Sequence, residues 1–249
     1  MKAVVSPAKK LNEKRSFPES LNFTEPVFKE EATRLVEHLK KLSPSDLADL
    51  MGLSEKLAEL NYKRFQEWTT DGAYPAIFLY DGDTYKGLDI ESFPPVHLDK
   101  LQDKVRIISG LYGVLRPLDL IMPYRLEMKT PLTLNGYPDL KSFWRDKVTS
   151  FLKDDLKGEP LVNLASKEYF EVIDETKLNA PVIQVDFKDF KGGKYKTIGL
   201  LAKRARGNMA RWIAENNIKS VEELKNYTGL GYRYNKEMSS GNHLVFTRN

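Results

Sequence analysis

Residues 105–117 read Val-Arg-Ile-Ile-Ser-Gly-Leu-Tyr-Gly-Val-Leu-Arg-Pro, a short apolar run that opens onto serine, glycine and arginine. Branched apolar residues bounded by turn residues predict a β-strand over 105–109. The same pattern recurs at 2–6 and at 161–165, where each run again ends next to serine. We therefore expect three short strands that share one design.

Charged residues follow each of these strands within a few positions. Lys9 follows the first, Arg116 the second and Lys167 the third. In an open α/β sheet, ligands bind in the crevice beyond the carboxyl ends of the strands. If the three strands are parallel neighbours, their loops converge on one cleft. The alternative is a set of ordinary strand-to-helix turns, in which Ser166 acts as a helix N-cap.

Strands and helices alternate along the rest of the chain. Further strands are predicted at 76–80, 182–187, 194–201 and 243–247, with Gly192-Gly193 as the turn of a hairpin. Apolar residues at helical spacing predict helices at 29–42, 45–51 (with Ser45 as N-cap), 54–67, 139–156 and 202–215. No linker or repeat divides the chain. We expect a mixed α/β (α+β) fold, a single domain over residues 1–249 with a central sheet, surrounding helices and a basic cleft.

The composition excludes several classes of protein. The 249 residues are 41% hydrophobic and 30% charged, which is typical of a soluble globular chain. No cysteine is present, and the three histidines lie far apart, so we expect no metal site built from thiolates or paired histidines. No segment approaches the ~20 apolar residues that a membrane crossing needs. We expect a cytoplasmic protein without a membrane anchor, and the absence of nucleotide-loop and zincin motifs predicts no cofactor.

Positive charge is concentrated in one segment. The net charge is only +4, but residues 188–211 hold eight basic residues and a single acid, Asp189. The helix predicted at 202–215 places Ala205, Met209, Trp212 and Ile213 on its apolar side, flanked by basic residues. A local basic field on a nearly neutral chain indicates a polyanionic partner, unless these lysines and arginines form an ordinary solvated surface.

Residues 116–127 crowd ionic groups among apolar ones, and two prolines in this segment restrict its backbone. Such a segment is either a buried ion-pair network or a rigid arch that presents arginines to an anion. The network interpretation suits Asp119 and Glu127. The ligand interpretation suits Arg116 and Arg125 equally well, because the guanidinium fork matches phosphate oxygens.

Residues 47–58, Leu-Ala-Asp-Leu-Met-Gly-Leu-Ser-Glu-Lys-Leu-Ala, resemble a helix-hairpin-helix element. In that element two short helices flank a hydrophobic-Gly-hydrophobic turn, and backbone N–H groups approach a DNA phosphate. Gly52 occupies the first glycine position of the turn. Ser54 replaces the usual second glycine.

Five stretches, taken in order, resemble the YaaA peroxide-stress protein family. They are Ser-Pro-Ala-Lys at 6–9, Ser-Gly-Leu-Tyr-Gly-Val-Leu-Arg-Pro-Leu-Asp-Leu at 109–120, Pro-Tyr-Arg-Leu-Glu-Met at 123–128, Asn-Leu-Ala-Ser at 163–166 with Glu-Tyr-Phe at 168–170, and Ala-Lys-Arg-Ala-Arg-Gly at 202–207. The resemblance implies a cytosolic bacterial protein that limits free intracellular iron during peroxide stress. It also implies DNA binding, a mixed fold, a positively charged cleft and a helix-hairpin-helix-like element. Without cysteine or clustered histidine, iron control would need carboxylates or an indirect route.

Three hypotheses follow. In the first, the protein binds DNA, non-specifically as a duplex, through cationic cleft residues and the Leu50–Ser54 turn; the contacts would be Lys9, Arg116, Arg125, Lys167, Lys203, Arg206, Gly52 and Ser54. In the second, it is an enzyme acting on a nucleotide, nucleobase or modified nucleic acid, with Asp119 or Glu127 as base. That hypothesis rests on groups a phosphate clamp would not need, namely Ser6, Tyr112, Tyr124, Asn163, Ser166, Glu168 and Tyr169. In the third, it is a structural stress protein without a cleft ligand.

Overall fold

An eight-stranded sheet forms the centre of the molecule. In the computed structural model, which describes residues 1–134 and 136–249, seven strands run in the order β4-β3-β1-β6-β7-β10-β9 and β8 pairs with β7. Their bounds are β1 Lys2–Val5, β3 Val105–Ser109, β4 Gly113–Leu115, β6 Leu161–Leu164, β7 Val182–Lys191, β8 Lys194–Lys196, β9 Arg233–Tyr234 and β10 His243–Arg248. The neighbours β3-β1-β6-β7-β10 are parallel, whereas β4, β8 and β9 are antiparallel to their partners. A small second sheet pairs β2 (Tyr74–Pro75) with β5 (Leu120–Ile121).

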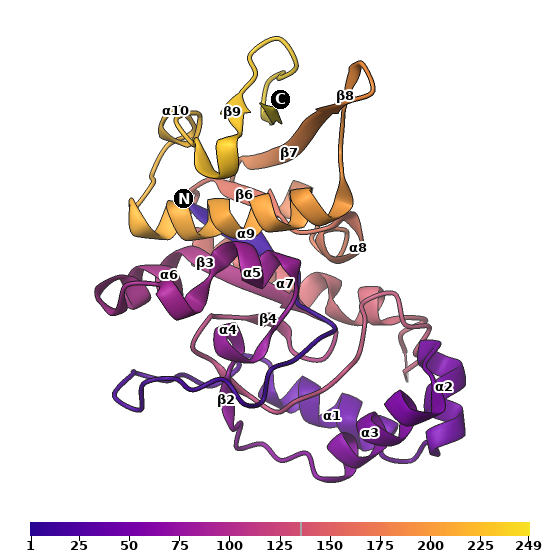
Figure 1. Ribbon diagram of the computed structural model, residues 1–249. Helices are drawn as coiled ribbons and strands as arrows, with labels where there is room; N and C mark the ends of the chain where they lie inside the picture. Colours follow the sequence, from indigo (N-terminus) through magenta and orange to yellow (C-terminus); the bar gives the residue numbers. More distant parts are fainter. Residues whose placement is uncertain (135) are drawn as a thin grey trace.

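Helices surround this sheet, and Figure 1 shows α5, α6 and α9 in front of it. Helix α9 packs against β1, β6 and β7, and α6 packs against β1 and β3. The helices are α1 Lys29–Leu39, α2 Pro44–Met51, α3 Glu55–Gln66, α4 Ala76–Leu79, α5 Asp83–Leu88, α6 Leu98–Lys104, α7 Leu140–Leu156, α8 Lys167–Phe170, α9 Gly199–Glu215 and α10 Val221–Leu224. Short 3-10 turns lie at Ile90–Ser92, Pro95–His97, Glu175–Lys177 and Gly229–Gly231. Within the described ranges, the helices are too short or too polar to cross a membrane.

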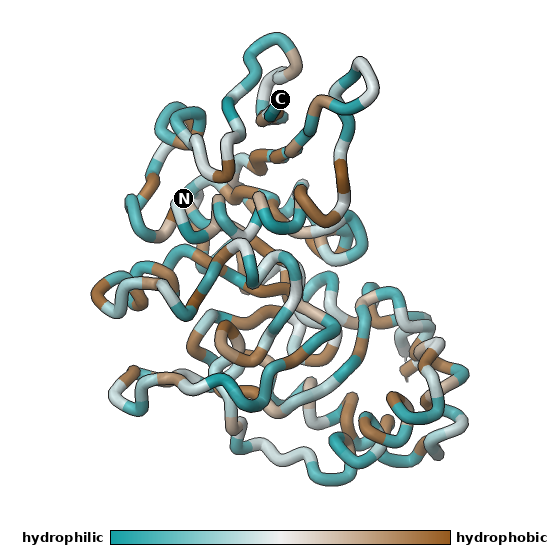
Figure 2. Tube along the Cα trace, viewed as in Figure 1, coloured by the Kyte–Doolittle hydropathy of each residue, from teal (hydrophilic) through white to brown (hydrophobic). Residues whose placement is uncertain are grey.

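The core is one contiguous cluster that runs from Met1 to Phe246. Every residue of β1 and β3 is buried, as expected for parallel strands covered on both faces. Figure 2 shows hydrophobic residues concentrated in the strands and on the inner sides of the helices. The mixed α/β fold and the single domain predicted from the sequence are thus confirmed.

The helix predicted at 202–215 and the hairpin turn predicted at Gly192-Gly193 are also confirmed. Ala205, Met209 and Ile213 of α9 are buried, while Trp212 at the margin of this stripe is partly exposed and meets the Tyr227 ring edge-on. The Gly192-Gly193 pair joins β7 to β8 as a two-residue turn in which both glycines have positive φ, 65° and 77°. Side chains with a β-carbon rarely adopt that conformation, so glycine is favoured at both positions.

Three local predictions are wrong. In the run predicted as a strand at 76–80, Ala76–Leu79 form a short buried helix, because Pro75 precedes them and the Ala76 and Ile77 N–H groups bond to the Asp119 and Pro117 carbonyls. A short apolar run that is buried all round carries no periodicity to distinguish the two structures. The strand predicted at 194–201 ends at Lys196, and α9 begins at Gly199.

The third concerns α2, whose N-cap is Ser43 and not Ser45. Ser43 accepts a hydrogen bond from the Asp46 backbone N–H, and the Asp46 side chain accepts one from the Ser43 N–H. Pro44 then occupies the first helical position, where its missing N–H costs nothing.

Candidate functional site

A cleft of about 570 Å³ lies beyond the carboxyl ends of β1 and β6. The strand order reverses direction at β1, which pairs with β3 on one side and β6 on the other. Such a reversal leaves the loops at neighbouring strand ends pointing apart and opens a crevice between them. The walls are contributed by five separate segments: 6–10, 81–86, 124–127, 164–169, and Lys203 with Arg206 of α9.

Hydrogen bonds between two serines hold the base of the cleft together. Ser6, directly after β1, accepts a hydrogen bond from the Ser166 N–H at 2.8 Å, and the two hydroxyl oxygens lie 3.3 Å apart. The Tyr85 hydroxyl of α5 donates to the Ser6 carbonyl oxygen at 3.0 Å. These contacts fix the loops after β1 and β6 and the start of α5 relative to one another.

Helix α9 reaches the cleft because two glycines let it approach α5 closely. A β-carbon on Gly87 would lie 1.9 Å from the Arg204 carbonyl oxygen, and one on Gly207 would lie 1.7 Å from the Thr84 carbonyl oxygen. The helices pack backbone to backbone at these points. Lys203 and Arg206, three residues apart, therefore project from α9 into the same wall.

Glu127 is the centre of a cationic cluster in the opposite part of the lining. Its carboxylate lies 2.8 Å from Lys9 Nζ, 3.4 Å from Arg125 Nη2 and 3.6 Å from Lys129 Nζ. Burial disfavours the ionised carboxylate, but the Lys9 hydrogen bond and the charges of Lys9, Lys129 and Arg125 outweigh it and hold the pKa of Glu127 below its ordinary value. Glu127 is therefore ionised at neutral pH.

Arg206 is a partly buried guanidinium without a protein counter-ion among the described residues. Its Nε is buried and lacks a hydrogen-bond partner, as does Nε of Arg125. Burial lowers the pKa of Arg206, and the more distant charge of Asp186 opposes this effect without cancelling it. Neighbouring Lys203 is exposed and also forms no ion pair with the residues described. This corner of the cleft has uncompensated positive charge.

The Tyr124 ring in the cleft wall is held by a buried chain of hydroxyls. Its hydroxyl lies 2.7 Å from that of Tyr80 and 2.6 Å from Ser109 Oγ, and Ser109 Oγ accepts N–H bonds from Leu111 and Tyr112. Because both lone pairs of Ser109 are used, its proton is directed to Tyr124. Burial raises the pKa of Tyr124 to about 12, although both hydroxyl hydrogen bonds act against the rise. Tyr124 is thus a neutral, fixed group.

Comparison with known proteins identifies the family of this chain. The family model described as "Peroxide stress protein YaaA" matches residues 1–238. A UPF0246 protein of Flavobacterium johnsoniae is 49% identical over 253 residues, and one of Flavobacterium psychrophilum is 46% identical over 253 residues, each covering 100% of both chains. A UPF0246 protein of Idiomarina loihiensis is 47% identical over 255 residues, covering 100% of this chain and 98% of its own. The chain belongs to the YaaA peroxide stress protein family.

Ten of the residues predicted for the site line this cleft. They are Ser6, Lys9, Tyr124, Arg125, Glu127, Ser166, Glu168, Tyr169, Lys203 and Arg206. Four of the five motifs through which the chain resembles the YaaA family thus meet at one place, although they are spread over 200 residues, whereas the motif at 109–120 contributes no residue to the lining.

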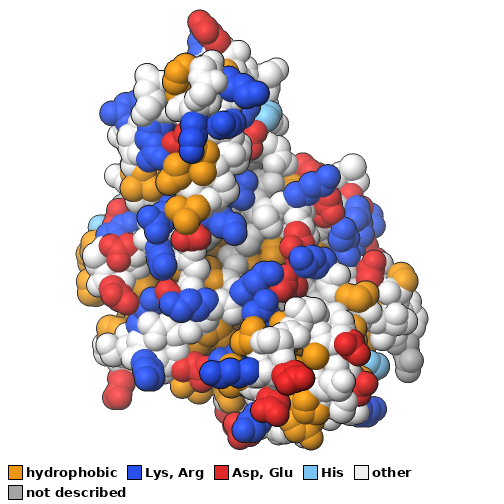
Figure 3. Space-filling model, turned by 45° about the vertical axis from the view of Figure 1, so that its right-hand side comes forward, with side chains coloured by type: hydrophobic (Ala, Val, Ile, Leu, Met, Phe, Trp, Pro, Cys, Tyr) orange, Lys and Arg blue, Asp and Glu red, His pale blue; other side chains and the backbone are white. Residues whose placement is uncertain are grey.

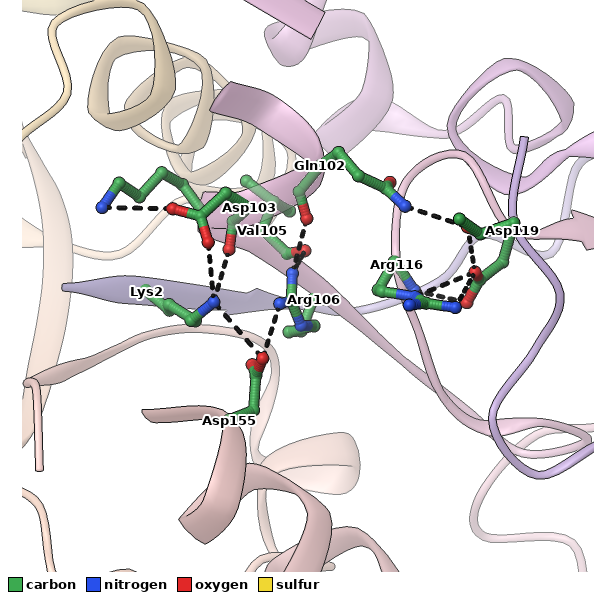
Figure 4. Close-up of polar contacts among 10 residues, drawn as sticks. Lys2, Gln102, Asp103, Val105, Arg106, Arg116, Asp119 and Asp155 are labelled. Carbon is green, nitrogen blue, oxygen red and sulfur yellow. Dashed lines mark hydrogen bonds and ion pairs between the residues drawn. The ribbon is translucent and has the colours of Figure 1, made fainter. Parts of the chain in front are cut away.

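Arg116 and Asp119 lie elsewhere, and the antiparallel strand β4 explains why. The register Ile107↔Leu115 returns the chain to the start of β3, away from the carboxyl ends of the parallel strands. There Asp119 is fully buried and accepts bonds from the Arg116 backbone N–H at 2.8 Å and Arg116 Nε at 3.1 Å, as Figure 4 shows. Burial raises the pKa of Asp119, against the bonds from Thr24 and Arg116. Arg116 and Asp119 therefore form a structural ion pair and do not line the cleft.

Three other predicted residues do not line the cleft either. The buried Tyr112 hydroxyl accepts from Trp68 Nε1 and the Met122 N–H, so it is part of the core. The Asn163 side chain donates a hydrogen bond to Gln184 Oε1 and accepts one from the Ala165 N–H. The Lys167 side chain is 89% exposed and lies 3.6 Å from Glu171. The side chains of all three residues make these other contacts and do not line the cleft.

Gly52 and Ser54 lie in the turn between α2 and α3, which Figure 1 places well away from α9. Gly52 has φ 60°, a left-handed conformation that ends α2 and favours glycine. Its N–H and that of Leu53 bond to the Ala48 carbonyl. Ser54 caps α3 without a side-chain hydrogen bond, which leaves the first N–H groups of α3 open to other acceptors.

The sequence prediction missed one wall, residues 81–86. Lys10 Nζ pairs with Asp81 at 2.5 Å, and this hydrogen bond lowers the pKa of Asp81. The signal was present, because Asp81-Gly82-Asp83 follows the apolar run 76–80 as the other motifs follow theirs. Among the residues described, no three His, Asp or Glu side chains are grouped so as to hold a metal ion.

Proposed function

We propose that this protein acts in the peroxide-stress response by binding DNA, with phosphate groups of the strand held at Arg206 and Lys203. The observation that supports this is the unpaired guanidinium of Arg206 in the cleft wall. A partly buried charge without a partner is costly, so a site that keeps one is suited to an anionic ligand. Phosphate oxygens satisfy a guanidinium fork in the way that protein carboxylates do.

Other arginines of the chain show how a structural guanidinium differs. Arg106 bonds to the Gln102 and Val105 carbonyls and to Asp155 at 2.8 Å (Figure 4). Arg211 bonds to Glu215 and to the carbonyls of Leu88, Asp89 and Ser92. Both have their terminal Nη donors committed to protein oxygens, although Nε of Arg106, like that of Arg206, has no partner. Among the described residues, neither Nε nor the terminal donors of Arg206 bond to a protein oxygen.

Exposed lysines extend the positive charge around the mouth of the cleft. Lys9, Lys10, Lys86 and Lys203 are all exposed lining residues. Figure 3 shows Lys and Arg side chains on both sides of a hollow in this face of the molecule. Such cations contact the phosphate backbone without reading its sequence, so the proposed binding is non-specific.

The α2–α3 turn is a second, separate contact in this proposal. The uncapped N–H groups at the start of α3 and the partial positive charge of that helix end suit a phosphate. Because this turn lies apart from α9, both sites together would engage an extended nucleic acid and not a small ligand.

In this proposal the protein limits free iron indirectly, as a consequence of DNA binding, and does not bind iron in the cleft. Glu127, an acidic group of the cleft, already contacts Lys9, Arg125 and Lys129. An iron ion would have to displace these cations, which makes Glu127 a poor ligand as it stands.

Duplex binding over a range of salt concentrations tests the proposal. If about four to six phosphates are neutralised, log K should fall against log salt with a slope of about −4 to −5. Lys203→Gln with Arg206→Gln should weaken binding to all sequences alike and make the slope shallower by about 2. Arg204→Gln is the matched control, because it removes one charge from the same helix at a residue that pairs with Asp83 and does not line the cleft. A slope near zero, or normal binding by the double variant, contradicts the proposal.

A second candidate function, an enzyme acting on a nucleotide, nucleobase or modified nucleic acid, is favoured by the carboxylates in the same cleft. Glu127 and Glu168 lie among cations and hydroxyls, an arrangement that a phosphate clamp does not need. Glu127→Gln removes the candidate base and also removes a charge that repels phosphate. An enzyme should lose peroxide protection in a complemented deletion strain while DNA affinity is unchanged or higher. Full protection by the stable variant would leave DNA binding as the function.

A further inference from the structure

We infer that the cleft receives one nucleotide unit, with its phosphate at Arg206 and Lys203 and its base against the tyrosines and Glu168. This inference rests on the phosphate site of the proposed function and adds the chemical class of the group that enters the cleft. The volume of about 570 Å³ is that of a small-molecule site. It is too small to admit a double helix, whose major groove alone is about 12 Å wide.

The lining has the polarity that a nucleotide needs. Arg206 and Lys203 provide uncompensated positive charge from α9. Glu168, from the segment after β6, provides a hydrogen-bond acceptor, and its Oε1 is oriented by the Lys129 N–H at 3.3 Å. A nucleotide has an anionic phosphate at one end and, on most bases, N–H donors at the other. Glutamate accepts such base donors in known modes of base recognition.

Between these polar groups the cleft offers flat and apolar surfaces. Tyr85, Tyr124 and Tyr169 are buried and line it, with Leu126 and Leu164 beside them. The Tyr124 ring is fixed by Tyr80 and Ser109, and Tyr85 by the Ser6 carbonyl. Rigid aromatic rings bind a planar base without losing side-chain freedom. Inorganic phosphate alone would leave this part of the cleft unused.

Calorimetric titration with dGMP, deoxyguanosine and inorganic phosphate tests the inference. We expect dGMP to bind at least about tenfold more tightly than either fragment, because it uses both ends of the cleft. Arg206→Gln should lower affinity for dGMP and for phosphate by about tenfold or more. Glu168→Gln should lower affinity for dGMP by about tenfold and leave phosphate binding unchanged or tighter, because it removes a negative charge from the lining. Glu168→Gln keeps an oxygen that accepts the Lys129 N–H, and Arg204→Gln controls for charge; a thermal melt of each variant verifies folding.

Phosphate that binds as tightly as dGMP, or dGMP binding unaffected by both variants, would overturn the inference. Competition with labelled duplex identifies the source of the nucleotide. Displacement of DNA by dGMP indicates a nucleotide of the strand, and binding of dGMP without displacement indicates a free nucleotide. A protein that binds duplex but no dGMP refutes the nucleotide pocket and leaves the proposed function intact. A protein that binds dGMP but no duplex supports the nucleotide pocket and refutes DNA binding as the function.

Discussion

Gly207 of α9 lies directly against the carbonyl oxygen of Thr84 in α5, at a point where a β-carbon would stand 1.7 Å from that oxygen. The two helices are therefore in backbone contact. Because Arg206 precedes Gly207, this contact also sets the position of the guanidinium in the cleft.

Gly207→Ala should force α9 away from α5. We expect a loss of about 1–3 kcal/mol in the free energy of unfolding, as for other overpacked cores, and weaker DNA binding because Arg206 moves. Urea unfolding and a binding titration measure the two effects. Gly199→Ala is the control: it is in the first turn of the same helix with nothing within 4 Å of a β-carbon. It should leave stability unchanged or raise it by up to about 1 kcal/mol. Equal stability of the two variants would show that the contact is unimportant.

Asp119→Asn should affect stability and not function. The substitution weakens the contacts with Arg116 and Thr24, so we expect a cost of about 1–3 kcal/mol. DNA affinity per folded molecule should be unchanged, because Asp119 lies outside the cleft. Thermal melting and a binding titration on the same preparation check this. A variant with a normal melting temperature that fails to protect cells from peroxide would restore Asp119 as a catalytic candidate.

The stability contributed by Glu127 should depend on pH. Its pKa in the folded protein lies below the ordinary value of 4.5, so the folded state favours the ionised carboxylate. This contribution is fully present above pH 4.5 and is lost as the pH falls toward the folded pKa. Wild type should therefore exceed Glu127→Gln in stability at pH 7, and the difference should shrink as the pH falls below 4.5. Denaturant titrations at a series of pH values measure it, and a constant difference would argue against the ion pairs with Lys9 and Arg125.

Ser54→Asp tests the α2–α3 turn as a phosphate contact. Aspartate is as good an N-cap as serine, so the fold should be retained. The added negative charge should weaken DNA binding about fivefold by repulsion. Ser45→Asp, the same change at an exposed position in the first turn of α2, should have little effect. Electrophoretic mobility shifts compare the two, and equal binding by both variants would restrict DNA to the cleft.

The sequence predicts which residues meet in the cleft wherever a motif directly follows a parallel strand. Lys9 and Ser166 follow β1 and β6, and the crevice rule placed them together. The rule failed for Arg116, because no sequence pattern in residues 110–116 predicts that β4 pairs antiparallel with β3. The rule has no physical basis for Asp81, because the run before it forms a helix and not a parallel strand of the sheet. Pairing direction and helix packing are decided by long-range contacts that local patterns do not contain.

The central place of β1 in the sheet affects how the chain is made. Its two neighbours, β3 and β6, leave the ribosome about 100 and 160 residues later, and until then the apolar residues Ala3, Val4 and Val5 lack strands on either side. A long wait for distant partners slows folding and exposes strand edges to aggregation. The nascent chain thus carries an unpaired apolar strand through most of its synthesis, and the cleft exists only after Ser166 has joined Ser6.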